Sequence, residues 1–202
     1  VLDMLEKLAS EDQEKYTKFW LAFGGVLKEG LAEDIPNQER IAKLFRFAST
    51  KTDSSDQNVS LDDYLQRMQK DQDVLYYITA EGFNAAKNCP HLEIFRKKGI
   101  EVLLLDDRVD EWWLAHYHTH CGKKFQSIAK SDTDLSKFAD DAQKEEKEKI
   151  KTDSEELLKK MKDVLVDKVQ EVRVSDRLTD SPVCIVTSEN EMTYNLQRII
   201  SD

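Results

Sequence analysis

The stretch from Val74 to Leu114 constrains the fold more than any other part of the chain. Two uninterrupted apolar runs, Val74–Ile78 and Val102–Leu105, flank a polar-faced segment that is long enough for a crossover helix. Apolar runs bounded by turn residues are typical of strands that are covered on both faces. The stretch therefore predicts a βαβ unit in a small parallel sheet, with Lys123–Ala129 as a third strand.

Turn residues divide the predicted crossover. Gly82 follows the first strand, Pro90 splits the crossover into two helical pieces, and Gly99 ends the second piece. The sequence contains neither G-x-x-x-x-G-K-[ST] nor G-x-G-x-x-G, the two glycine-rich patterns that bind phosphate. Two adjacent tryptophans, Trp112 and Trp113, follow the second strand. An α/β unit with large aromatic side chains and no nucleotide loop favours a surface that holds other proteins.

The part of the chain before the first strand has the apolar spacing of helices. Gly30 is predicted to end the first long helix, and Ser60 with Asp63 has the spacing of a capping box before a later one. The two apolar stripes consist of Tyr16, Phe19, Trp20, Phe23, Val26 and Leu27, and of Ile41, Leu44, Phe45 and Ala48.

The composition changes from about Ser131. Charged residues of both signs dominate the run from Asp140 to Glu156, which indicates a solvated boundary between domains. Capping signatures at Thr152/Glu155 and Ser188/Glu191 predict two further helices, the first with an apolar face. Two strands, Val169–Val174 and Val183–Thr187, are predicted between these helices. The apolar face of the first helix comprises Leu157, Leu158, Met161, Val164 and Leu165.

Charge and cysteine content exclude several classes of protein. The net charge is -10, and 35% of the 202 residues are charged, which disfavours a nucleic-acid binder. No apolar run approaches the length of a membrane span. Three widely spaced cysteines, Cys89, Cys121 and Cys184, fit a reducing cytoplasm without a disulfide framework. A start at Val1 within a helical pattern suggests a piece of a longer protein.

Several sequence blocks together resemble the ninety-kilodalton heat-shock chaperone family, and most of all its bacterial member. The resemblance covers nearly the whole chain in collinear order. The blocks are WLAFGGVLKEG, STKTDSS, SLDDYLQRM, YYIT, HLEIFRKKGIEVLLLDDRVDEW, KFQSIAK and VRVSDRLTDSPVCIV.

The resemblance implies an α/β and α+β fold in three parts. These parts are a helical segment of the middle domain at residues 1–70, a small α/β/α sandwich with a parallel sheet at 71–135, and the first part of an α+β C-terminal domain at 136–202. It further implies that ATP and magnesium bind to an N-terminal domain upstream of this chain. The arginine-bearing catalytic loop would also precede Val1, and the dimerisation helices would follow Asp202. The chain itself is then expected to hold no cofactor, to hydrolyse no ATP and to dimerise weakly.

Trp112 is the first candidate site residue. Neighbouring helical positions differ by about 100°, so one of the two tryptophans can face the sheet while the other points outward. An exposed indole offers a large apolar area and one hydrogen-bond donor, which suits loose contact with unfolded chains. The resemblance places Glu111 and Trp112 on the family's client-binding surface. The alternative is that both rings belong to the core.

The second candidate is the apolar stripe of the last helix, formed by Met192, Leu196, Ile199 and Ile200. In the family, the matching helix presents methionine and other flexible apolar side chains to clients, and methionine adapts to many partners. Leu196 stands where bacterial members often have a second methionine, which weakens this argument. The alternative is that a truncated domain leaves this helix disordered or packed in a crystal contact.

The sequence HYHTHC contains four possible metal ligands, His116, His118, His120 and Cys121. On an extended segment, alternate positions would bring the three imidazoles to one face, where the thiolate could add a fourth ligand. The resembling family has an ordinary helix end and turn here, so a surface turn is the favoured interpretation and no metal is assigned.

The sequence-based conclusion is a cytoplasmic chaperone segment that binds unfolded or partly folded clients and transmits ATP-driven motion within a homodimer, without nucleic-acid or membrane partners. One alternative is a small-molecule-binding α/β domain at the carboxyl ends of the strands, near Thr79–Glu81 and Asp106–Asp107. The other alternative is a metal-binding module at His116–Cys121.

Overall fold

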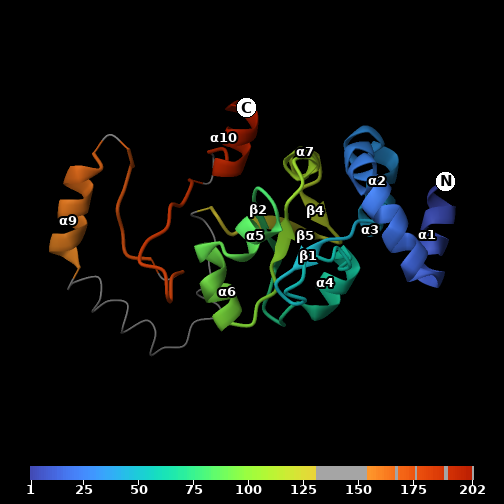
Figure 1. Ribbon diagram of the computed structural model, residues 1–202, viewed down its shortest axis with the longest axis horizontal. Helices are drawn as coiled ribbons and strands as arrows, with labels where there is room; N and C mark the ends of the chain where they lie inside the picture. Colours follow the sequence, from blue (N-terminus) through green and yellow to red (C-terminus); the bar gives the residue numbers. More distant parts are fainter. Residues whose placement is uncertain (131–153, 167, 176, 189–190, 202) are drawn as a thin grey trace.

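The computed structural model of the chain describes residues 1–130, 154–166, 168–175, 177–188 and 191–201 (Figure 1). The predicted division between residues 135 and 136, and the charged run as far as Asp153, therefore lie outside the described residues. Among those described, no helix has the length and apolar character to cross a membrane.

The chain begins with two antiparallel helices, α1 (Leu2–Glu11) and α2 (Gln13–Glu33), followed by the short helices η1 (Ile35–Asn37) and α3 (Gln38–Lys43). The side chain of Asp12 accepts a hydrogen bond from the backbone N–H of Lys15 and so caps α2. Gly30 does not end α2, because the helix continues beyond it to Glu33.

The buried face of α2 differs from the predicted stripe. Phe23 and Val26 are 54% and 64% exposed, and the core instead receives Tyr16, Trp20, Gly24, Lys28 and Leu31. The prediction was wrong at Phe23 and Val26 because a buried lysine and a buried glycine, which no apolar pattern includes, set the phase of the helix.

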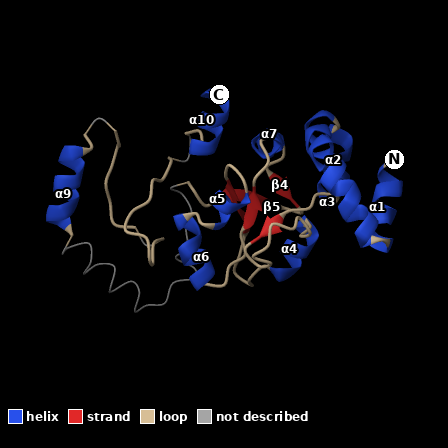
Figure 2. Ribbon diagram, in the orientation of Figure 1, coloured by secondary structure: helices blue, strands red, loops and turns tan. Residues whose placement is uncertain are grey.

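Within the described residues, five strands form one mixed sheet in the order β1–β3–β2–β5–β4 (Figure 2). The strands β2 (Val74–Thr79), β3 (Leu103–Leu105) and β5 (Lys123–Ser127) are parallel, as predicted. The two-residue edge strands β1 (Ala48–Ser49) and β4 (Thr119–His120) are antiparallel to their neighbours. The predicted N-terminal helical segment is therefore not wholly helical, because β1 joins the sheet.

The crossover from β2 to β3 follows the turn residues of the sequence. It consists of α5 (Phe83–Lys87), η2 (Pro90–Leu92) and α6 (Glu93–Lys97), and Pro90 separates the two helical pieces as predicted. Gly82 and Gly99 adopt φ values of 87° and 64°, a left-handed backbone that side chains disfavour.

The sheet is covered on both faces, which confirms a sandwich. One face packs against the helices that precede β2 and against α7 (Val109–His116), and the other packs against the crossover. Successive residues alternate between the two cores, so Leu103 and Leu105 join the first while Leu104 joins the second. The helix α4 (Leu61–Arg67) begins with the predicted capping box of Ser60 and Asp63.

The described part of the C-terminal segment has two helices, α9 (Glu155–Val164) and α10 (Tyr194–Ser201). None of the residues of α9 is buried, and Figure 1 shows this helix at a distance from the sheet. Ser154 occupies the N-cap position of α9 without a side-chain cap bond, and the predicted cap residue Thr152 lies outside the described residues.

The prediction of two strands at Val169–Val174 and Val183–Thr187 was wrong. Both segments are irregular, and only Thr187 forms a β-bridge, to Lys130. A strand needs a neighbouring ladder for its backbone groups, and apolar alternation cannot supply one. The side chains of Val183 and Ile185 are accordingly 60% and 75% exposed.

The last helix starts later than the capping signature predicts. Glu191 accepts a hydrogen bond from the backbone of Ser188, but the first residue of α10 is Tyr194. The hydroxyl of Thr193 accepts a hydrogen bond from the N–H of Leu196 and so caps α10. Met192 consequently precedes the helix on which it was expected to lie.

Candidate functional site

Helix α7 buries one of its two tryptophans and exposes the other, as its sequence predicts. Trp113 is fully buried, and its ring makes edge-to-face contacts with Phe45 and Phe125 at centroid distances of 5.5 and 5.3 Å. Trp112 is 55% exposed, with its ring centroid 4.5 Å from that of His116. The alternative that both rings belong to the core is therefore wrong, because Trp112 lies at the surface.

A buried ion cluster fixes the first turn of α7 against α2. The ammonium of Lys28 lies 2.7 Å from a carboxylate oxygen of Asp110 and 2.6 Å from one of Asp107, although only 1% of the lysine side chain is exposed. Asp110 also accepts a hydrogen bond from the indole N–H of Trp113 at 2.8 Å. Burial alone would lower the pKa of Lys28, but the two carboxylates outweigh burial and raise it. Lys28 is therefore charged at neutral pH.

Glu111 connects α7 to the C-terminal segment. Its carboxylate accepts hydrogen bonds from the hydroxyl of Thr193 at 3.1 Å and from the side-chain amide of Asn195 at 3.2 Å. A second contact joins Arg198 of α10 to Glu81, at 3.0 Å, in the loop after β2. These contacts attach the start of α10 to α7, although the two segments are far apart in the sequence.

Several apolar side chains near this junction remain exposed to solvent. Met192 is 54% exposed and Ile200 is 64% exposed, while Leu196 and Ile199 are partly exposed. We call Glu111, Trp112, Met192, Leu196, Ile199 and Ile200 the α7–α10 surface. This surface combines exposed apolar groups with one carboxylate, and that carboxylate is already engaged by Thr193 and Asn195.

A small cavity lies at the carboxyl ends of β2 and β3, where the small-molecule alternative was expected. Its volume is about 70 Å³, and α10 contributes Asn195, Arg198 and Ile199 to its wall. Ligand pockets are typically about 300–1,000 Å³, so this cavity has room for a few water molecules rather than a cofactor. Burial, with the neighbouring charge of Asp107, raises the pKa of Asp106 at its wall.

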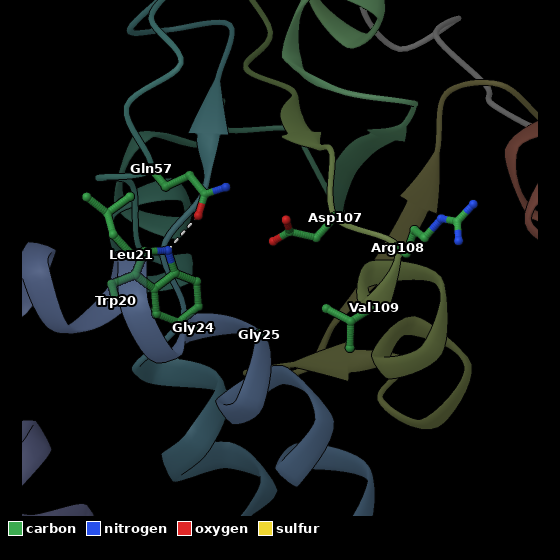
Figure 3. A pocket seen from close by; sticks show the side chains of 8 residues that line it. All are labelled: Trp20, Leu21, Gly24, Gly25, Gln57, Asp107, Arg108 and Val109. Atoms are coloured by element: carbon green, nitrogen blue, oxygen red, sulfur yellow. Dashed lines mark hydrogen bonds between the residues drawn. The ribbon is translucent and has the colours of Figure 1, made fainter.

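A larger hollow of about 420 Å³ lies between α2 and the start of α7 (Figure 3). The indole N–H of Trp20 donates a hydrogen bond of 2.6 Å to Gln57 at its edge. A side chain at Gly24 would meet the Trp20 ring at 2.9 Å, so glycine allows the ring to lie against the helix. Sequence reasoning missed this hollow, for which the adjacent glycines Gly24 and Gly25 within a helix were the available signal.

The four residues of the HYHTHC sequence separate in the structure. His116 is the last residue of α7, and its Nδ1 lies 2.8 Å from the carbonyl oxygen of Trp112. His118 is exposed, whereas His120 is buried and lies with Cys121 beside Asp62. The extended segment that the metal alternative required, with three imidazoles on one face, does not form, since α7 runs through His116.

Comparison with known proteins identifies the class of the chain. The family model described as "Hsp90 protein" matches residues 1–202. The chain therefore belongs to the Hsp90 protein family, a family of chaperones.

Among curated relatives, the chain is similar to the chaperone protein HtpG of Dechloromonas aromatica (strain RCB), with 58% identity over 200 residues, 99% of this chain and 31% of that protein. It is also similar to the chaperone protein HtpG of Nitrosomonas eutropha (strain DSM 101675 / C91 / Nm57), with 55% identity over 99% of this chain and 32% of that protein. The chain thus spans about a third of the length of the curated relatives that it matches.

Proposed function

We propose that this chain is the part of an HtpG-type chaperone that holds unfolded or partly folded client proteins on the α7–α10 surface. Binding would use many weak apolar contacts, centred on the indole of Trp112. In the whole protein, a cytoplasmic homodimer, ATP and magnesium would bind to a separate N-terminal domain. This chain would hydrolyse no ATP itself and would transmit the resulting motion to the client.

The observation that carries the proposal is the pair of hydrogen bonds between Glu111 and the start of α10. Thr193 and Asn195 both donate to Glu111, which supports a single surface that joins the exposed indole of α7 to the exposed apolar residues of the C-terminal segment. Large aromatic residues dominate the binding energy of protein interfaces, and methionine adapts to varied partners. An unfolded client offers such varied apolar groups.

Binding of a fluorescently labelled, permanently unfolded protein, followed by anisotropy, tests the proposal. Trp112→Ala removes the exposed indole and should weaken binding by about 1–2 kcal/mol, or about 5–30-fold. Ile35→Ala is the matched control, because Ile35 is apolar and 71% exposed on η1. Equal affinities for the two variants would contradict the proposal.

The small-molecule alternative retains one observation in its favour, the 420 Å³ hollow beside α2. Leu21, which lines this hollow, is 73% exposed. If Leu21→Ala weakens client binding as strongly as Trp112→Ala, the client surface extends into the hollow. If it leaves client binding unchanged while small apolar probes shift the NMR signals of Gly24 and Gly25, the hollow is a separate ligand site.

A further inference from the structure

Three potential metal ligands meet where α4 faces the turn between β4 and β5. Asp62 is the second residue of α4, His120 ends β4, and Cys121 follows it in the turn. One carboxylate oxygen, one imidazole nitrogen and the sulfur all lie within 4.8 Å of one another. Asp62 and His120 are 58 positions apart, so the fold rather than the local sequence assembles the group.

The spacing of these atoms fits a tetrahedral metal. The Nε2 atom of His120 lies 3.3 Å from Oδ1 of Asp62. A zinc ion with bonds of about 2.0–2.1 Å to nitrogen and oxygen holds two such ligands about 3.3 Å apart at the tetrahedral angle. A Zn–S bond of about 2.3 Å would place the sulfur about 3.6 Å from both atoms, and it lies within 4.8 Å of them.

The second nitrogen of His120 already has the partner that a metal-bound histidine requires. Its Nδ1 lies 2.8 Å from the hydroxyl of Tyr117, and both side chains are buried. Ligating histidines generally donate their other N–H to a fixed oxygen, which sets the tautomer and orients the ring.

The site is open to solvent on one side. The side chain of Asp62 is 48% exposed and Cys121 is exposed, while His120 forms the buried floor. An ion can therefore enter, and water can occupy the fourth corner. Arg46 is a nearby cation, and its guanidinium donates to the backbone carbonyls of Lys43 and Phe45.

We propose that Asp62, His120 and Cys121 bind one divalent zinc ion, with water as the fourth ligand. On binding, the thiol releases its proton to solvent and the imidazole proton moves from Nε2 to Nδ1. The hydroxyl of Tyr117 then turns its own hydrogen away, so that its oxygen accepts the hydrogen bond from Nδ1. The metal replaces the hydrogen bond between His120 and Asp62 and links α4 to the β4–β5 hairpin. This role is independent of client binding and of ATP.

The test uses the 202-residue chain with Cys89→Ser and Cys184→Ser, which leaves Cys121 as its one thiol. Titration with Co²⁺ should give one equivalent of a tetrahedral d–d spectrum with a thiolate-to-cobalt charge-transfer band. Zn²⁺ should then displace the cobalt stoichiometrically. A spectrum of octahedral cobalt without the charge-transfer band would overturn the proposal and leave His120 as a core histidine with two hydrogen bonds.

Variants assign the ligands. Cys121→Ser should abolish the charge-transfer band, and Asp62→Asn should weaken Zn²⁺ binding by more than the about 10–100-fold that is lost with a group that only orients a ligand. Tyr117→Phe should weaken binding by about 10–100-fold while keeping the band. His118→Gln is the matched control, since this exposed imidazole lies outside the cluster. If His118→Gln weakens binding as much as Asp62→Asn, the proposed ligand set is wrong.

Discussion

Different interactions stabilise residues 1–130 and the described residues of 154–201. All the buried hydrophobic side chains of the described chain lie at or before Ile128. The described part of the C-terminal segment buries two side chains, Arg177 and Thr193, and both are polar. Apolar packing thus stabilises the first region, while hydrogen bonds attach the second to it.

The attachments of the C-terminal segment are few and specific. Arg177 donates to the carbonyl of Ile128 at 2.9 Å, and the ring of His91 bonds to the carbonyl of Ile185 at 2.9 Å. The carboxylate of Glu93 accepts from the backbone N–H groups of residues 179, 180 and 181. Each hydrogen bond makes a net contribution of about 1 kcal/mol to stability. The C-terminal segment can therefore detach while residues 1–130 stay folded. Its apolar side chains therefore remain available to a partner.

The strongest test of this contrast compares the adjacent tryptophans. Trp113→Ala should lower the free energy of unfolding by about 5 kcal/mol, because it leaves a large cavity and removes the donor to Asp110. Trp112→Ala should change it by less than about 0.5 kcal/mol, since the ring is on the surface. Urea unfolding followed by circular dichroism measures both. Similar losses for the two variants would show that the outward ring also stabilises the fold.

The buried ion cluster gives the next largest effect. Lys28→Met should cost about 3 kcal/mol, because it leaves the carboxylate of Asp110 buried without its cation. Adding Asp110→Asn should recover part of this loss, since the amide oxygen still accepts the Trp113 N–H and carries no charge. Chemical denaturation of the two single variants and the double variant measures the coupling. Additive losses would indicate that the two charges do not interact.

These charges also explain what the sequence could and could not predict. The apolar runs predicted the parallel strands, and the 100° step of a helix predicted one inward and one outward tryptophan. The buried phase of α2 was missed because Lys28 enters the core only with Asp107 and Asp110, which come much later in the sequence. The sequence did not predict which tryptophan is buried, because Trp113 packs against Phe45, which is distant in the sequence.

The residues of the α7–α10 surface and those of the proposed metal site relate differently to the sequence. The residues of the α7–α10 surface were named from helical spacing and resemblance, but the bond from Thr193 to Glu111 was not, because nothing local relates these positions. The ligand cluster was sought within HYHTHC, whereas its third member, Asp62, comes from α4. Spatial neighbours from separate segments leave no signal in the spacing of a single sequence.

A smaller and local effect is expected at the cap of α10. Thr193→Val keeps the branched shape but removes the hydroxyl that caps Leu196 and donates to Glu111. The amides of α10 should lose about 1 kcal/mol of protection in hydrogen exchange, while those of β2 remain unchanged. Thr187→Val serves as a control that leaves α10 untouched. Equal loss of protection in β2 would show that the two regions unfold together.

Acid should release the C-terminal segment from Glu93. The backbone N–H groups of Asp180 and Thr179, together with the hydroxyl of Ser181, lower the pKa of Glu93 to about 2. A carboxyl group whose pKa is lower in the folded state than in the unfolded state stabilises the folded state at every pH above the unfolded-state pKa. The stabilisation is therefore complete above about pH 4.5 and is lost as the pH falls towards 2.

NMR of the amides of residues 179–181 at decreasing pH measures this release. In Glu93→Gln, residues 179–181 should be attached more weakly to residue 93 already at neutral pH. Their amide signals should then change little as the pH falls. Persistence of the pH-dependent release in Glu93→Gln would assign it to another group.

The most direct test of the account is an NMR titration of the labelled chain with a permanently unfolded protein. The account predicts that signals of Glu111–Trp112 and of Met192–Ile200 shift together, with one binding curve, and that Trp112→Ala weakens both responses. Silence of these signals while the client binds elsewhere, or two unrelated curves, would contradict a single client surface formed by α7 and α10.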